Sequence, residues 1–355
     1  AIQLFESQNP GVKIKGEYGG FGGYQEKLTT QISGNSEPDI MQINWAWISQ
    51  FSKTGDGFYD LKKSKDVKLD DFSGESWKSG MVNGKLNALP ISYTARVYLW
   101  NKSMWDKAGL PLPKTWDDFL AAGKVFEQKL GKGFHPLDGQ LYDRILISHA
   151  YIQQKTGKPW IYPNQPKVAL TEAEALDWVK FFNSMVTTGA SPTQQYRVSS
   201  GGGDSERPTE QMPDWVAGKF AGNYTWDSTF KPRLSTPPKT MNFDVGDFLT
   251  MPGAKNSGMF GRPSMMFAVS KNSKNPEVAA KFVAWLLQSP EAAEILGTVR
   301  GAPMSKTQMD VLIKEKKFTD LELKAMKQIQ SIKHDYPSPL MEHNRIQQWV
   351  REVFE

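Results

Sequence analysis

The sequence contains no cysteine and only four histidines, at positions 135, 149, 334 and 343. Without cysteine there are no disulfide bridges, zinc–thiolate sites, iron–sulfur sites or cysteine nucleophiles. No two histidines have the i, i+4 spacing of a helical metal site, so we expect no metal. Apolar runs such as residues 265–269 are far shorter than the roughly 20 residues of a membrane-spanning helix. The sequence therefore excludes a membrane-embedded chain.

Motifs of catalysis and of cofactor binding are also missing. There is no G-x-S-x-G nucleophile elbow and no P-loop. The glycine cluster at 19–23 has neither the Lys-Ser/Thr ending of a P-loop nor the G-x-G-x-x-G spacing, and indicates a turn where backbone can approach another group closely. Acidic residues are plentiful, but no pair stands out as a glycosidase acid and base. We expect no catalytic residues and no cofactor.

What the chain does have is enough length and apolar content for about two packed domains. It has 355 residues, of which 39% are hydrophobic and 23% charged. The net charge is +5 and the pI about 9.0, either for solubility or to attract an anionic ligand. The sequence has no run of basic residues of the kind that marks nucleic-acid binding. Aromatic residues reach 12%, with 12 Trp, and Trp suits sites that stack on flat ligands.

The pattern of residues predicts alternating strands and helices, which indicates an α/β protein. Strands are expected at 12–16, 38–43, 85–91, 96–100, 220–224, 243–249 and 265–269. Helices are expected at 24–33, 45–51, 115–130, 141–155, 171–187, 275–297, 304–331 and 343–355. Thr115 and Thr171 are predicted N-caps, the second within a capping box. The first ten residues resemble the end of a helix, so we expect further residues before them.

Three clusters of polar and aromatic residues follow or join predicted strands. They are NWAW at 44–47, SYTAR at 92–96 and NYTWDS at 223–228. In α/β sheets, ligands bind beyond the carboxyl ends of strands. An indole can cover the apolar face of a sugar ring, while amides, carboxylates and guanidinium groups bond its hydroxyls. The clusters therefore favour a sugar-binding site.

The alternative for each Trp is a place in the core. For Trp47 and Trp100 the two interpretations have equal weight because apolar residues surround them. Trp226 favours the site because its neighbours are polar, whereas Trp116 favours capping or packing. Three further tryptophans fall within helical patterns and are predicted to be core residues, namely Trp105, Trp178 and Trp285.

Arg96 and Arg262 lie in strand-like surroundings where a charge needs a partner. An unpaired buried charge is costly, so each should meet a carboxylate. That carboxylate is either an internal Asp or Glu or belongs to a ligand held by the bidentate guanidinium. The context slightly favours a ligand for Arg262 and favours neither partner for Arg96.

Several stretches in order along the chain resemble the family 1 extracellular solute-binding proteins, the carbohydrate receptors of bacterial ABC importers. They are FESQNPGVKI at 5–14, YQEKLTTQISG at 24–34, PDIMQ at 38–42, NGKLNALPI at 83–91, LWNK at 99–102, LPLPKTWD at 110–117 and AVSKNSKNPEVAAKFVAWL at 268–286. Within the family the chain is most similar to the oligogalacturonide-binding branch. The stretches behind this are MQINWAW at 41–47, FSKTGDGFY at 51–59, PISYTAR at 90–96, YTWDST at 224–229 and PGAK at 252–255.

The resemblance implies a two-lobed α/β fold of the class II periplasmic-binding-protein type, with discontinuous lobes and a hinge of crossover segments. The first lobe is expected at 1–100 and 254–300, and the second at 103–250 and 303–355. It further implies a periplasmic, monomeric receptor that closes on its ligand by hinge bending and breaks no bond. Its partners would be an acidic oligosaccharide from pectin and the membrane permease subunits of the importer. The family's first strand, which usually helps line the cleft, is absent from this sequence, as are its last helices.

The expected ligand-binding residues combine rings, hydroxyl-bonding groups and cations. They are Phe21, Asn44, Trp45, Trp47, Ser92, Tyr93, Arg96, Tyr224, Trp226, Asp227 and Arg262. Two alternatives stay open. A receptor for neutral oligosaccharides would use Arg96 and Arg262 in internal salt bridges. A secreted lyase or glycosidase acting on acidic polysaccharide would release product.

Overall fold

The computed structural model describes residues 1–20, 23–162, 167–201, 207–331, 339–342 and 344–354. The chain divides into two compact units, each built from two stretches of sequence. Unit 1 comprises 1–94 and 262–319, and unit 2 comprises 95–261 and 320–355. These boundaries differ from the expected lobes mainly at 303–319, which belong to unit 1 because α13 (Lys306–Lys314) packs on helices of that unit.

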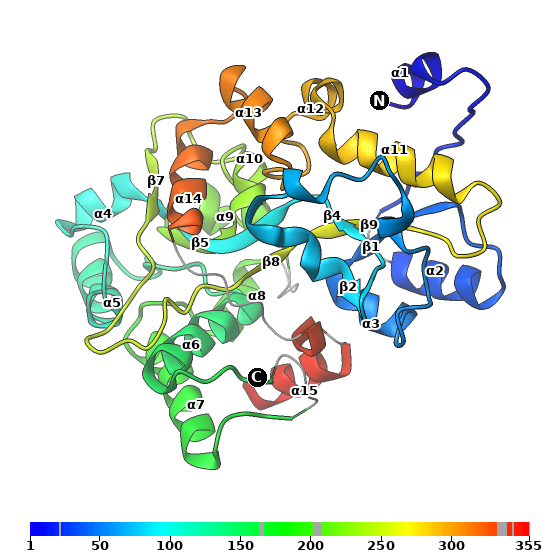
Figure 1. Cartoon of the computed structure of the whole chain (residues 1–355). Coiled ribbons are helices and arrows are strands. Elements are labelled where there is room, and N and C mark those ends of the chain that lie inside the picture. Colours follow the sequence, from blue (N-terminus) through cyan, green and yellow to red (C-terminus); the bar gives the residue numbers. More distant parts are fainter. Residues whose placement is uncertain (21–22, 163–166, 202–206, 332–338, 343, 355) are drawn as a thin grey trace. The chain divides into compact units, whose positions relative to one another are not determined.

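Unit 1 is organised around a three-stranded antiparallel sheet in the order β1-β9-β4 (Figure 1). Its strands are β1 (Ile40–Asn44), β9 (Met265–Val269) and β4 (Leu89–Pro90). A two-stranded antiparallel hairpin, β2 (Met81–Val82) and β3 (Lys85–Leu86), comes directly before β4 in the sequence. The helices are α1 (Ile2–Gln8), α2 (Tyr24–Ser33), α3 (Ile48–Phe51), α11 (Pro276–Gln288), α12 (Pro290–Leu296) and α13. Helix α11 packs on β9 and closes the core of this unit.

Unit 2 contains a second sheet in the order β6-β5-β7, with β8 (Gly261–Pro263) also paired to β5. The strands are β5 (Tyr93–Asn101), β6 (Gly222–Trp226) and β7 (Phe243–Gly246). Its helices are α4 (Lys102–Ala108), α5 (Trp116–Leu130), α6 (Leu141–Thr156), α7 (Glu172–Thr187), α8 (Gln194–Ser200), α9 (Pro213–Val216), α10 (Phe230–Arg233), α14 (Asp320–Gln330) and α15 (Asn344–Phe354). Helices α6 and α7 lie side by side (Figure 1), and α15 contacts α6.

Trp100, near the end of β5, is one of the largest fully buried side chains of unit 2. It is fully buried, stacks on Tyr98 at 5.1 Å and meets Trp105 edge-on at 5.2 Å. The neighbouring strands have glycines against its ring, Gly222 on β6 and Gly246 on β7, where any Cβ would overlap the indole. Trp100 is thus a core residue, and the adjacent strands supply glycine because the ring occupies the space of a side chain.

Most predicted elements are present, but the ranges 275–297 and 304–331 each hold two helices, α11 and α12 in the first and α13 and α14 in the second. The helix over 24–33 and the N-caps at Thr115 and Thr171 are present, and each Thr belongs to a capping box. The predicted strand over 12–16 is wrong, because these residues form no strand and none of the described strands pairs with them. Instead, the Ile14 amide donates to Glu6 Oε1 at 2.8 Å and ties the segment to α1.

Candidate functional site

The end of the unit 2 sheet brings Arg96 and Trp226 together. They are directly opposite in the antiparallel β5–β6 pair, so their side chains share one face of the sheet. The Arg96 guanidinium carbon lies 4.6 Å from the centre of the Trp226 ring. Trp226 is half-buried and Phe260 packs near it at 5.8 Å. The antiparallel pairing of β5 with β6 places these two side chains side by side. The sequence predicts a different cause, namely that the carboxyl ends of neighbouring strands meet at one edge of the sheet.

Asp143, in the first turn of α6, supplies the carboxylate partner of Arg96. Asp143 Oδ1 lies 2.8 Å from Arg96 Nη1, and the two side chains are only 1% and 8% exposed. The same nitrogen donates to the Tyr224 carbonyl at 2.8 Å. Burial raises the pKa of the Asp143 carboxyl to about 6, although the positive charge of Arg96 acts in the opposite direction. Of the two partners considered for Arg96, the structure shows the internal one.

Tyr142, the residue before Asp143, extends this cluster. Its ring lies 5.9 Å from the Arg96 guanidinium carbon and also 5.9 Å from that of Arg351 on α15. The Gln347 amide donates to the Tyr142 hydroxyl at 3.4 Å. Rings and guanidinium groups therefore alternate in the order Trp226, Arg96, Tyr142, Arg351.

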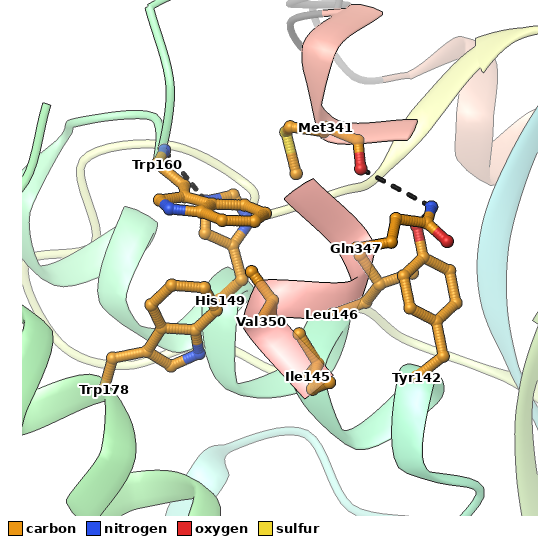
Figure 2. Close-up of a pocket in the computed structure, with 9 residues that line it drawn as sticks. All are labelled: Tyr142, Ile145, Leu146, His149, Trp160, Trp178, Met341, Gln347 and Val350. Carbon is orange, nitrogen blue, oxygen red and sulfur yellow. Dashed lines mark hydrogen bonds between the residues drawn. The ribbon is translucent and has the colours of Figure 1, made fainter. Parts of the chain in front are cut away.

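Tyr142 also lines a mostly apolar cavity within unit 2. Figure 2 shows the Trp160 and Trp178 rings on one side of this cavity and Tyr142 on the other. The lining residues come from α6, α7, α15 and adjacent segments, namely Tyr142, Ile145, Leu146, His149, Trp160, Trp178, Met341, Gln347 and Val350. The cavity volume is about 10 Å³, room for a single water, and Trp178 belongs to the hydrophobic core of unit 2 while Trp160 packs against it.

The other two predicted site residues of unit 2 have structural contacts. Asp227 is 8% exposed, and its Oδ1 accepts from the Ala95 amide at 3.1 Å, which ties the turn after β6 to β5. Tyr224 is 1% exposed and packs on Tyr98 at 4.8 Å. Its burial raises the pKa of its hydroxyl above the ordinary value. The Tyr224 side chain therefore packs in the core of unit 2, and its contact with a ligand stays a prediction.

In unit 1 the cluster at 44–47 is built into a short 3-10 turn. Asn44 Oδ1 caps that turn by accepting from the Ala46 amide at 3.0 Å. Trp45 and Trp47 are 5% and 7% exposed. Trp47 contacts Tyr24 at 6.1 Å and Phe51 at 6.4 Å between ring centres. The core interpretation holds for Trp47, and neither indole presents an open face.

The remaining predicted residues of unit 1 lie near the ends of its segments. Ser92 is 1% exposed, donates to the Arg300 carbonyl at 2.7 Å and lies 2.6 Å from the Ser264 hydroxyl. Arg262 is half-buried and donates to the carbonyls of Pro263 and Ser264 at 2.8 and 3.2 Å. Tyr93 is half-buried at the start of β5. Phe21 lies outside the described residues.

Tyr142, Asp143 and Arg351 were missed by the sequence reasoning. The requirement for a carboxylate near Arg96 was recognised, but 38 acidic residues could meet it. The available signal was Asp143 itself, an acidic residue in a helix whose neighbours at 145–147 are all aliphatic. Trp105 and Trp178 are core residues, as predicted, at 1% and 5% exposure.

The described residues hold neither a candidate metal site nor a candidate membrane-spanning helix. No group of three or more His, Asp or Glu side chains is placed to hold a metal ion in that part of the chain. Over the same residues, every helix is too short or too polar to cross a membrane.

Comparisons of the chain with protein families and with solved structures agree on one family. Residues 1–293 match the model for the family described as bacterial extracellular solute-binding protein. The chain is similar to the structure of a periplasmic oligogalacturonide binding protein from Yersinia enterocolitica in complex with saturated digalacturonic acid, at 34% identity and a TM-score of 0.89, covering 99% of this chain and 87% of that one. It is also similar to a periplasmic solute binding protein from Pectobacterium atrosepticum, at 36% identity and a TM-score of 0.92, covering 99% and 88%.

A more distant relative is the diacetylchitobiose binding protein of Streptomyces coelicolor, with 28% identity over 283 residues. That match covers 76% of this chain, which spans 61% of the length of the Streptomyces protein. The arabinooligosaccharide-binding protein of Bacillus subtilis matches at 26% identity, over 76% of this chain and 60% of its own length. All these relatives are binding proteins.

Proposed function

Since the chain belongs to the family of bacterial extracellular solute-binding proteins, we propose that it is a periplasmic receptor for an acidic oligosaccharide of the oligogalacturonide class. The observation that carries this proposal is the similarity to the oligogalacturonide binding protein of Yersinia enterocolitica over 99% of the chain. The receptor would act as a monomer and deliver its ligand to the permease subunits of an ABC importer. Binding would stabilise the conformation that the importer recognises.

The chemistry of unit 2 supports a sugar ligand. Trp226 is a half-buried indole at the end of a strand, with the Arg96 guanidinium on the ring and Asp227 next in the chain. We propose that the pyranose stacks on the Trp226 ring and that Tyr142 offers a second aromatic surface. Arg351, beside Tyr142, places a further cation within this cluster. The net charge of +5 also favours an anionic ligand.

Unit 1 contributes to the proposal through its less buried candidates. Tyr93 and Arg262 are half-buried, and each is at or next to a segment that connects the two units. We propose Tyr93 as a ring contact and Arg262 as the residue that bonds a uronate carboxylate. Asn44 and Ser92 are the weaker part of the proposal, because their side chains already bond to protein atoms.

A receptor for neutral oligosaccharides is the second candidate. The observation in its favour is the Arg96–Asp143 contact, because an arginine paired internally has no charge left to offset with a ligand. The diacetylchitobiose and arabinooligosaccharide binding proteins among the relatives are named for neutral sugars. Both candidate functions are therefore oligosaccharide receptors, and they differ only in whether the oligosaccharide is charged.

Isothermal titration calorimetry with digalacturonate, trigalacturonate and maltotriose separates them. We expect binding of the two acidic sugars and none of maltotriose. The substitution Trp226→Ala should weaken binding at least tenfold, about 1.4 kcal/mol, because the stacking surface is lost. Trp349→Ala serves as the matched control, since Trp349 is 55% exposed on α15. If maltotriose binds and the two acidic sugars do not, the proposed acidic ligand is wrong and the receptor takes a neutral oligosaccharide.

A further inference from the structure

The Arg96–Asp143 contact is a buried ion pair next to the proposed stacking ring. Its side chains are 8% and 1% exposed, and the guanidinium carbon of Arg96 is 4.6 Å from the centre of the Trp226 ring. In the described part of the chain, neither oxygen of Asp143 receives an aligned hydrogen bond, although Oδ1 lies 2.8 Å from Arg96 Nη1. The contact is therefore one of charge with charge, and its strength depends on Asp143 being ionised.

The other charged groups near Asp143 have closer partners of their own. Arg197 on α8 is paired with Asp138, in the segment before α6, at 3.4 Å. Arg233 on α10 is paired with Glu210. Further titratable or charged groups of the adjacent elements are the Tyr224 hydroxyl on β6, Tyr142, Arg144 and His149 on α6, and Arg351 on α15. This leaves Asp143 as the group that offsets the charge of Arg96.

We propose that Asp143 is a positioning residue that determines specificity: by offsetting the charge of Arg96, it sets how strongly the Trp226 site attracts an acidic sugar. The inference rests on the proposed function, which places the ligand on Trp226. When Asp143 is ionised, the pair presents no net charge to that ring. When Asp143 is neutral, the Arg96 guanidinium presents a full positive charge through the ring in a poorly screened environment.

The pH range in which this happens is accessible to experiment. Burial raises the pKa of Asp143 to about 6, so the carboxyl gains its proton between about pH 7 and 5. Sugar carboxylates of ordinary acidity stay ionised in that interval. The affinity for an acidic sugar should therefore increase as the pH falls through 6, whereas the affinity for a neutral sugar should stay constant.

The first test uses the protein without ligand. Tryptophan fluorescence of the wild type is recorded from pH 8 to 4.5, and the same titration is run with Trp226→Phe to identify the part due to Trp226. We expect a transition near pH 6 that is lost in both Trp226→Phe and Asp143→Asn. Asp106→Asn is the matched control, because Asp106 forms an exposed pair with Lys102 on α4. A Trp226 transition that persists in Asp143→Asn would overturn the inference.

The second test measures digalacturonate affinity at pH 7.5 and 5.5. Asp143→Asn keeps the size and polarity of the side chain, but the negative charge is gone. We expect this variant to bind about three- to tenfold more tightly than the wild type at pH 7.5 and to lose the dependence on pH. Asp143→Ala, which removes the polar side chain as well, should also lose the dependence on pH. Circular dichroism of both variants checks that they are folded.

The outcomes separate this inference from the proposed function. If the wild type binds digalacturonate and Asp143→Asn leaves both the affinity and its pH dependence unchanged, the inference is wrong and the receptor stands. If no variant binds digalacturonate, the proposed ligand class is wrong and the inference falls with it, even where the fluorescence transition follows Asp143.

Discussion

His149 shows how burial alone fixes the state of one residue. It is 5% exposed on α6, and its Nε2 accepts from the Trp160 amide at 3.1 Å, so the ring is neutral with its proton on Nδ1 (Figure 2). Burial lowers the pKa of His149 to about 4. The unfolded chain then binds more protons than the native one between about pH 6.5 and 4. The contribution of His149 to stability is present above pH 6.5 and is lost as the pH falls through this window.

The substitution His149→Gln tests this assignment, because glutamine can accept from the Trp160 amide without titrating. Relative to this variant, we expect the wild type to lose about 2 kcal/mol of unfolding free energy between pH 7 and 5. Urea unfolding at both values measures the difference. The comparison with the variant is essential since Asp143, with its pKa raised to about 6, contributes in the opposite direction over the same interval. Equal pH dependence in the two proteins would contradict the assignment.

At this scale the sequence identified residue types more reliably than their partners. Trp226 and Arg96 were both singled out, and the need of Arg96 for a carboxylate followed from the cost of an isolated charge. That the carboxylate is Asp143 depends on where the first turn of α6 packs, which no local pattern encodes. Tyr224 and Trp226 share one face of β6, but Tyr224 packs on Tyr98 in the core whereas Trp226, at the end of the strand, is half-buried, and strand alternation alone does not predict this difference.

At the scale of elements, the β6–β5–β7 sheet depends on glycine beside Trp100. Gly222 is directly opposite Trp100 in the register, and a Cβ there would overlap the indole and approach the Pro136 carbonyl at 2.6 Å. We expect Gly222→Ala to lower the unfolding free energy by about 1–3 kcal/mol, because the sheet has to shift to make room. Chemical denaturation measures this loss.

Gly19→Ala is the matched control for that change, since a Cβ at Gly19 would have no heavy atom within 4 Å. It should change stability by less than about 0.5 kcal/mol. If both substitutions had the same effect, the explanation would lie in the unfolded chain and not in the packing around Trp100.

Helix ends were predictable because their signals are local, as the capping boxes at Thr115–Asp118 and Thr171–Glu174 show. Strand pairing was not. The segment at 12–16 alternates like a strand but has no partner, whereas β1 pairs with β9 from more than 200 residues away. Alternation of apolar and polar residues indicates that one face of a segment is buried. Whether the segment forms a strand depends on another strand lying close enough to pair with it.

At the scale of the whole molecule, the chain passes from one unit to the other after residues 94, 261 and 319. Each unit has a hydrophobic core of its own, one around Tyr98 and Trp100 and the other around Leu89 and Val269. A ligand that contacts residues of one unit stabilises that unit. A ligand that contacts both also couples their unfolding.

The proposed site residues come from both units, so ligand binding should protect both cores. At a concentration of 100 times Kd, digalacturonate should add about 2.7 kcal/mol to the unfolding free energy. Amide hydrogen exchange should then slow in β5 of unit 2 and in β9 of unit 1, and maltotriose at the same concentration should change neither. Slower exchange in β5 alone would restrict the stabilised part to unit 2 and argue against a ligand contact at Arg262 of unit 1.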